Sequence, residues 1–114
     1  MKTILFGVLL LASGLAIAQE GEPLDPQTCI SYMERSLMAT MQDSSGFRPE
    51  QADWRGIRSD ADRCGAWHAA HIEDPARRAL FAKAFATYTS GVAAPSMNAI
   101  ATFSYDSLAF TTAR

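Results

Sequence analysis

Apolar positions recur at helical spacing in the segment that starts at Asp25-Pro26. Asp25 has the acceptor side chain of an N-cap, and Pro26 suits the first helical position because an N–H there would be unpaired. Intervals of three and four residues then separate the apolar side chains, which predicts an amphipathic helix. These side chains are Ile30, Met33, Leu37 and Met41, with Met38 beside them. The polar segment 43–46 ends in glycine and predicts the end of the helix.

The same features predict a second and a third helix. Pro49 opens the second, with Phe47 placed to pack on its first turn. Asp74-Pro75 ends that helix and caps the third, for which Gly91 predicts the C-cap. The apolar stripe of the second helix consists of Trp54, Ile57, Ala61, Cys64, His68 and Ile72. The stripe of the third consists of Leu80, Phe81, Ala84, Phe85 and Tyr88.

Residues 96–112 are compatible with two structures. Ser96 suits the N-cap of a fourth helix, whose apolar residues would be Met97, Ile100, Phe103 and Phe110. Apolar residues in the same segment also alternate around Asp106-Ser107, a pattern typical of a β-hairpin with a weak turn. We favour the helix because the rest of the chain is helical and an isolated two-stranded hairpin is only marginally stable.

The first 18 residues have the three parts of an export signal. Lys2 supplies the positive start, residues 4–17 are largely apolar, and Ala16 and Ala18 form the small-x-small pattern of a cleavage site. A membrane-spanning helix needs about 20 apolar residues, and this stretch is shorter and interrupted by glycine. We therefore expect residues 1–18 to be a cleaved signal peptide and residues 19–114 to form a single small helical domain. The expected location is the periplasm or the medium, with no membrane association after cleavage.

The two cysteines, Cys29 and Cys64, are most simply explained as one disulfide in an exported chain. Cys29 falls in the first turn of the first predicted helix and Cys64 on the apolar face of the second. The expected fold is therefore mainly α: a small bundle of three to four helices held by one disulfide. The chain-entropy model gives such a bond about 4 kcal/mol, a large share of the stability of a small domain.

Composition and motifs argue against several classes of function. The formal net charge of −2 does not favour nucleic acid or an anionic membrane as a partner. The chain contains no Gly-x-Ser-x-Gly elbow, phosphate-binding glycine loop or dinucleotide fingerprint. We therefore expect a protein that is not an enzyme and needs no cofactor. A small hydrolase with His68 or His71 as its base is a less favoured alternative.

One group of residues has metal-ligating chemistry. Cys64, His68 and His71 are spaced to share one face of a helix, and a thiolate with two imidazoles is a ligand set for zinc or copper. A disulfide at Cys64 would remove the sulfur and leave only His68 and His71 as possible ligands. The competing interpretation is that His68 packs beside the disulfide and His71 is partly exposed to water.

A second group suggests a surface for another protein. Arg55 and Arg58 lie one helical turn apart and follow Trp54, and arginine and tryptophan are enriched among the residues that dominate protein interfaces. The competing interpretation is a solvated helix face on which Arg58 pairs with Asp62 at i,i+4. If the first interpretation holds, Trp54, Arg55 and Arg58 bind an acidic partner.

In size, export signal and cysteine count the chain resembles small exported helical proteins of bacteria that are held by one disulfide. That group includes acid-stress chaperones and the immunity proteins or enzyme inhibitors of the periplasm. The likeness implies a protein-binding module, and we favour an inhibitor or immunity-type role. The alternatives are a metal or small-ligand binder that uses His68 and His71, and a periplasmic stress chaperone.

Overall fold

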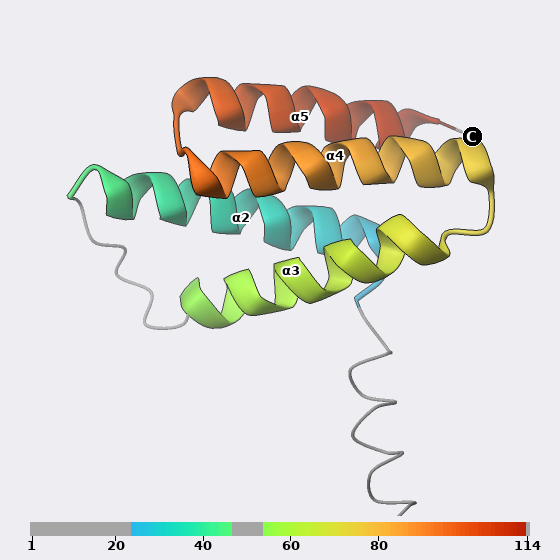
Figure 1. Ribbon diagram of the computed structural model, residues 1–114, viewed down its shortest axis with the longest axis horizontal. Helices are drawn as coiled ribbons and strands as arrows, with labels where there is room; N and C mark the ends of the chain where they lie inside the picture. Colours follow the sequence, from blue (N-terminus) through green and yellow to red (C-terminus); the bar gives the residue numbers. More distant parts are fainter. Residues whose placement is uncertain (1–23, 47–53, 114) are drawn as a thin grey trace, which may run out of the picture.

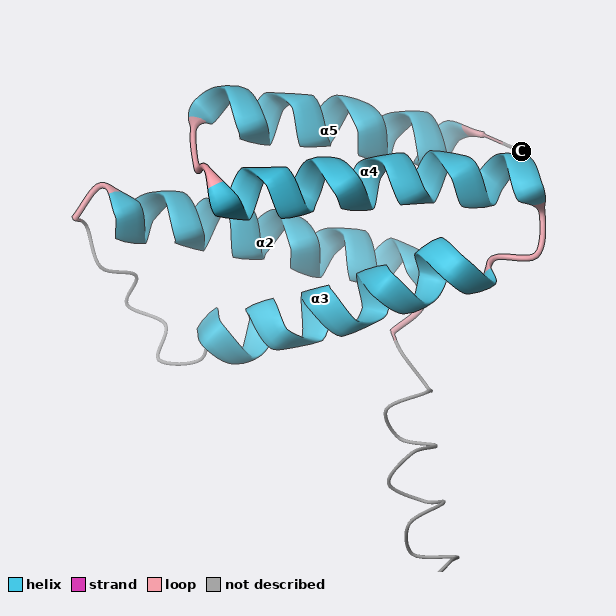
Figure 2. Ribbon diagram, in the orientation of Figure 1, coloured by secondary structure: helices cyan, strands magenta, loops and turns pink. Residues whose placement is uncertain are grey.

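The computed structural model describes residues 24–46 and 54–113, and these form a compact bundle of four helices joined by one disulfide (Figures 1 and 2). The helices are α2 (Pro26–Ser44), α3 (Trp54–His71), α4 (Pro75–Ala93) and α5 (Met97–Thr112). The mainly α fold predicted from the sequence is confirmed. None of these helices is long and apolar enough to cross a membrane. The signal peptide predicted at residues 1–18 lies outside the described residues.

Three of the helices begin where the sequence predicts, because a side-chain oxygen accepts the backbone N–H three residues further on. These hydrogen bonds measure 3.2 Å at Asp25, 2.9 Å at Asp74 and 3.0 Å at Ser96. Pro26 and Pro75 occupy the first position of their helices, as expected. The predicted opening of the second helix at Pro49, with Phe47 packed on it, lies outside the described residues.

The core lies between the four helices. α2 packs against each of the other three, and α4 packs against both α3 and α5. Aromatic rings dominate the centre, where Phe81 meets Phe110 edge to face with ring centres 5.2 Å apart. The apolar residues that are buried are Cys29, Ile30, Met33, Leu37, Ala61, Cys64, Phe81, Ala84, Tyr88, Phe103 and Phe110. Nearly all of them belong to the stripes predicted from helical spacing.

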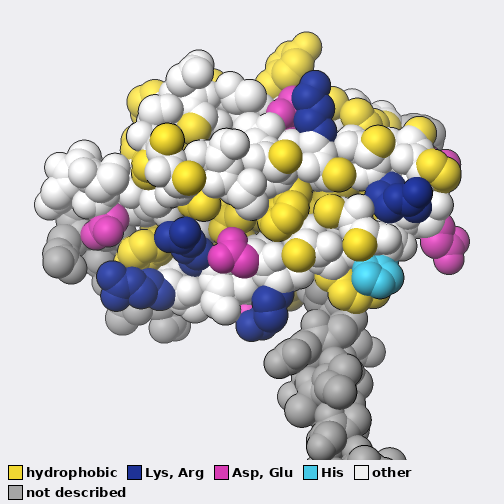
Figure 3. All heavy atoms as spheres, in the orientation of Figure 1, with side chains coloured by type: hydrophobic (Ala, Val, Ile, Leu, Met, Phe, Trp, Pro, Cys, Tyr) yellow, Lys and Arg dark blue, Asp and Glu magenta, His cyan; other side chains and the backbone are white. Residues whose placement is uncertain are grey.

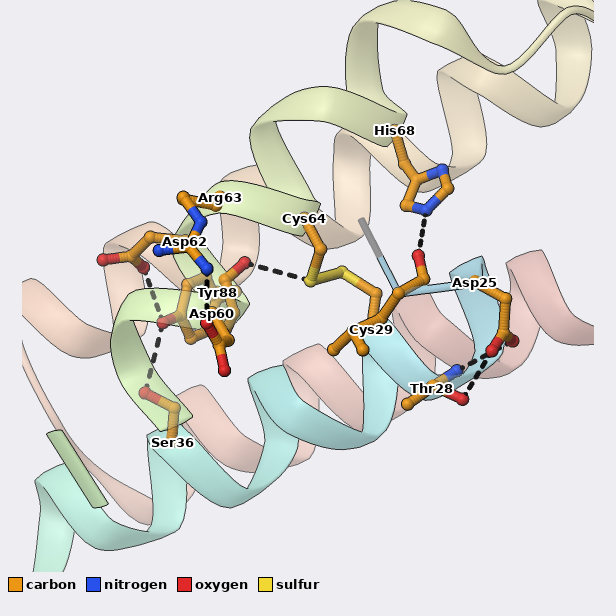
Figure 4. The surroundings of a disulfide bond; sticks show 12 residues. Asp25, Thr28, Cys29, Ser36, Asp60, Asp62, Arg63, Cys64, His68 and Tyr88 are labelled. Carbon is orange, nitrogen blue, oxygen red and sulfur yellow. Dashed lines mark hydrogen bonds and ion pairs between the residues drawn. A yellow bond between two sulfur atoms is a disulfide. The ribbon is translucent and has the colours of Figure 1, made fainter. Parts of the chain in front are cut away.

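The disulfide predicted between the two cysteines is present. Cys29 and Cys64 are joined with their Cα atoms 5.9 Å apart, and both side chains are buried (Figure 4). The bond connects the first turn of α2 to the middle of α3. It therefore fixes the pairing of these two helices at one point of the core.

The C-terminal segment is the helix α5, and the hairpin alternative is wrong. Phe103 and Phe110 enter the core as predicted, whereas Met97 is 69% exposed. Asp106 and Ser107, the turn of the hairpin alternative, are both buried in α5. The Thr87 hydroxyl donates to Asp106 at 2.6 Å, and Ser107 donates to a backbone carbonyl one turn earlier at 2.8 Å. These hydrogen bonds allow the polar pair to be buried within a helix.

The predicted C-cap at Gly91 is also wrong. α4 continues to Ala93, and Ala94 is its C-cap. Gly91 lies inside the helix and is buried, where a Cβ atom would come within 2.6 Å of Cδ2 of Leu37. The glycine therefore permits close packing of α4 on α2, and it does not end the helix.

Two consecutive arginines in the first turn of α4 bind the ends of two other helices. Arg77 donates to the carbonyl of Ala113 at 2.9 Å, and its guanidinium lies 4.1 Å from the ring centre of Phe110. Arg78 donates to the carbonyl of Ile72 at 2.8 Å. Both cations thus meet the unpaired carbonyls at a helix C-terminus, which the helix dipole favours.

Candidate partner-binding surface and the histidine pair

The predicted binding residues lie together on the first two turns of α3. Trp54 is half-buried at the first described position of the helix, and the Arg55 guanidinium lies 5.2 Å from the centre of its ring. That distance is typical of a cation–π contact, which leaves the charge of Arg55 exposed on an aromatic support. Arg58 is half-buried one turn further along. Figure 3 shows Lys and Arg side chains gathered over this end of α3.

The predicted pairing of Arg58 with Asp62 is absent from the structure. Across residues 24–46 and 54–113 a single ion pair is present, between Arg63 and Asp60 at 2.6 Å. Asp62 instead accepts a hydrogen bond of 2.7 Å from the hydroxyl of Tyr88 on α4. Neither Arg55 nor Arg58 therefore has a carboxylate within ion-pair distance in the described part of the chain.

A chain of two hydrogen bonds joins α3 to the core one turn after Arg58 (Figure 4). The Tyr88 hydroxyl donates to Asp62, so the Ser36 hydroxyl, 3.1 Å away, donates to Tyr88. The chain therefore joins α2, α4 and α3 through three side chains. Burial of the phenol is the main cause that raises the pKa of Tyr88 above its ordinary value.

Replacing Tyr88 with Phe should lower the free energy of unfolding by about 1 kcal/mol at neutral pH, because Ser36 then loses its buried acceptor. The raised pKa also predicts a pH effect. Unfolded tyrosine ionises near pH 10, and the folded phenol does so only at higher pH. The stability due to Tyr88 is therefore complete below about pH 10 and is lost as the pH rises further.

Urea unfolding at pH 7 and between pH 9 and pH 11 measures both effects. The exposed Tyr105→Phe variant is the matched control, since it removes a phenol that water already solvates. We expect Tyr88→Phe to lose less stability than the parent protein over the alkaline range. If the stability of Tyr88→Phe and that of Tyr105→Phe depended equally on pH, the role given to Tyr88 would be contradicted.

Both histidines that the sequence singles out already have hydrogen-bond partners. His68 is buried, and its Nε2 donates to the carbonyl of Leu24 at 2.6 Å (Figure 4). His71 is exposed; its ring stacks on Trp67 with centres 4.2 Å apart, and its Nδ1 donates to the carbonyl of Trp67 at 2.9 Å. His68 thus holds the chain that enters α2 against α3.

The sulfur of Cys64 is committed to the disulfide and does not complete a metal site with the histidines. Within the described ranges no group of three or more His, Cys, Asp or Glu side chains is placed to hold a metal ion. The hydrogen bonds of His68 and His71 occupy one ring nitrogen each. The arrangement agrees with a packed His68 and an exposed His71, the competing interpretation given above.

The structure also presents an apolar surface that was not predicted from the sequence, and it includes Met97, which was assigned to the core. Met97, Tyr105 and Leu108 on α5 are 69%, 76% and 59% exposed. Their spacing of eight and three residues places them on one side of the helix, away from Phe103 and Phe110. Their helical spacing could have predicted this second apolar stripe. The segment also contains enough apolar residues at other positions to form the stripe that faces the core, so the spacing did not distinguish the two sides.

No protein-family model, curated protein or solved structure matches this chain.

Proposed function

We propose that the chain is an exported protein-binding module of the inhibitor or immunity type, and that its target presents an acidic surface to the first turns of α3. The observation that carries this proposal is Arg55 stacked on Trp54, with Arg58 beside them and no carboxylate of the described residues paired to either arginine. A guanidinium binds a carboxylate through two parallel hydrogen bonds, which gives both energy and orientation.

The contacts that fix α3 to its neighbouring helices favour binding. α3 is fixed to α2 by the Cys29–Cys64 bond and to α4 by the hydrogen bond between Tyr88 and Asp62. Side chains on a rigid helix lose less conformational entropy when a partner binds them. The first turns of α3 therefore suit recognition by a preformed surface.

Two observations support export. Residues 1–18 have the pattern of a cleaved signal, and a structural disulfide is stable in an oxidising compartment. In the periplasm or the medium the disulfide stays oxidised, and it can hold α3 and the proposed binding surface in place.

The test is binding to exported proteins from the cells that produce the chain. The oxidised protein should retain one partner, and Arg55→Glu combined with Arg58→Glu should weaken the purified complex about 100-fold or more, as expected for an arginine hot spot placed against acidic groups. If that partner is an enzyme, its activity should fall on binding.

Arg35→Glu is the matched control, because Arg35 also lies over an aromatic ring, that of Tyr32 at 5.4 Å, but on α2. This variant should bind like the parent protein. Recovery of no partner, or equal binding by the Arg55/Arg58 double variant and the parent, would refute the proposal.

A further inference from the structure

One stripe on the outward side of α5 is apolar along the length of the helix. Met97, Ala101, Tyr105 and Leu108 follow one another at intervals of four, four and three residues and form a continuous stripe, here called the α5 stripe. All four are exposed, while Phe103 and Phe110 on the other side of the helix fill the core. α5 lies along the upper edge of the bundle in Figure 1, far from α3. Figure 3 shows hydrophobic side chains protruding at this edge.

α5 contributes no charged side chain to the surface around the α5 stripe. The single charged residue between Met97 and Thr112 is Asp106, which is buried and accepts a hydrogen bond from Thr87. A surface helix usually has one apolar stripe, which faces the core, and α5 has a second one that faces outward. α2 and α3 each expose at least two charged side chains and α4 exposes Lys83, whereas the described part of α5 exposes none. This difference points to a covered face on α5.

The α5 stripe fits a second copy of itself. If two α5 helices cross antiparallel about a twofold axis between Ser104 and Tyr105, Leu108 of one copy faces Ala101 of the other. The same register places Met97 opposite Thr112 and Tyr105 opposite Ser104. Each large side chain then meets a small one, which is the condition for close packing between helices. An uncharged face also allows two identical, net acidic chains to meet there without repulsion.

We propose that the α5 stripe docks a second copy of this chain, with the two α5 helices antiparallel and symmetry-related. A twofold pair uses the same patch on both copies, and the register above satisfies this requirement. From the exposed fractions, the three large side chains present about 400 Å² per copy, so their complete burial in the pair covers about 800 Å² in all. That area is below the roughly 1,200–2,000 Å² of stable specific interfaces, so the dimer is a weak one that forms and separates reversibly with concentration.

Sedimentation equilibrium of the oxidised protein over a wide concentration range tests the proposal. The parent protein should change from monomer to dimer as its concentration rises. Tyr105→Asp should raise the dissociation constant about tenfold or more, because the residue lies at the centre of the interface in both copies. Met38→Asp is the control, since Met38 is an apolar side chain 46% exposed on α2. This control should dimerise like the parent.

The register has a test of its own. Ala101→Lys and Leu108→Glu should each weaken the dimer, whereas the protein carrying both substitutions should recover much of the lost affinity through Lys–Glu pairs between copies. Melting curves at low concentration check that these exposed substitutions leave the monomer folded. No rescue in the double variant would refute the antiparallel register.

A parent protein that stays monomeric at the highest concentration would refute self-association, as would a dimer that Tyr105→Asp does not weaken. Loss of a different bound protein on Tyr105→Asp, with the parent monomeric, would assign the stripe to that other partner and reject this proposal. The inference does not depend on the proposed function. Arg55→Glu with Arg58→Glu should leave dimerisation unchanged, so each proposal can fail alone.

Discussion

Reduction of the Cys29–Cys64 bond should lower the melting temperature by about 15–30 °C. The bond closes a loop of 35 residues, for which the chain-entropy model gives about 4 kcal/mol of stability. In a domain of this size each kcal/mol corresponds to about 4–8 °C. Reduction also leaves two separate thiols in a core that is packed around a single bond. The contribution of this one bond is therefore a large share of the stability expected for so small a domain.

Circular dichroism melting measures the effect. Because both sulfurs are buried, the protein should be unfolded in denaturant with dithiothreitol and refolded with the reductant present. The Cys29→Ala/Cys64→Ala variant is the control: it should melt near the temperature of the reduced protein and respond to neither oxidant nor reductant. Superimposable melting curves for the oxidised and reduced parent would show that the bond adds no stability.

Gly65→Ala should destabilise the protein by about 1–3 kcal/mol, the usual cost of overfilling a packed core. Gly65 is buried on α3, where an added Cβ would overlap the ring of Phe85 on α4 and lie 3.3 Å from Sδ of Met33 on α2. Either the ring or the helix must move. The contact cost outweighs the helix propensity that alanine gains over glycine, about 1 kcal/mol.

Gly56→Ala tests the same substitution in the same helix with the opposite expected sign. Gly56 is exposed, and a Cβ there would meet nothing within 4 Å. Alanine should therefore stabilise the protein by up to about 1 kcal/mol. Denaturant unfolding of both variants gives the comparison, and a Gly65→Ala protein as stable as Gly56→Ala would show that α3 and α4 are not closely packed at this point.

The parts of the fold that depend on local chemistry were predictable. Asp25 and Asp74 begin helices because each side chain accepts an N–H within its own segment, whatever the rest of the chain does. The disulfide followed from the number of cysteines and the expected compartment. Helical spacing identified the buried stripes of α2, α3 and α4, because long amphipathic segments have only one arrangement of apolar residues that can face a core.

The parts of the fold that depend on contacts with a neighbouring helix could not be predicted from the sequence. Gly91 has the residue type of a C-cap, but Leu37 on α2 decides that it is a packing position. The sequence of α5 has apolar residues on both sides, so spacing grouped Met97 with Phe103 in the core stripe and did not show that Met97 is exposed. Asp62 was expected to pair along its own helix, and only the approach of Tyr88 from α4 gives it another partner. Such contacts join residues far apart in sequence, where local pattern carries no information.

For the candidate surface, too, the sequence gives the residue types but not their contacts with distant residues. Trp54, Arg55 and Arg58 were found from residue type and spacing, and the structure adds the stack of Arg55 on Trp54. His68 and His71 were found by the same reasoning, but the carbonyl of Leu24, 44 residues away from His68, decides how His68 is used.

The paired arginines at the start of α4 have a consequence for how the bundle opens. Arg77 closes the end of α5 and Arg78 the end of α3, although these two helices lie at opposite edges of the bundle. Unwinding the first turn of α4 withdraws both guanidinium groups at once. Fraying of the first turn of α4 should therefore loosen the ends of α3 and α5 together, although within the described residues these two ends make no hydrogen bond to each other.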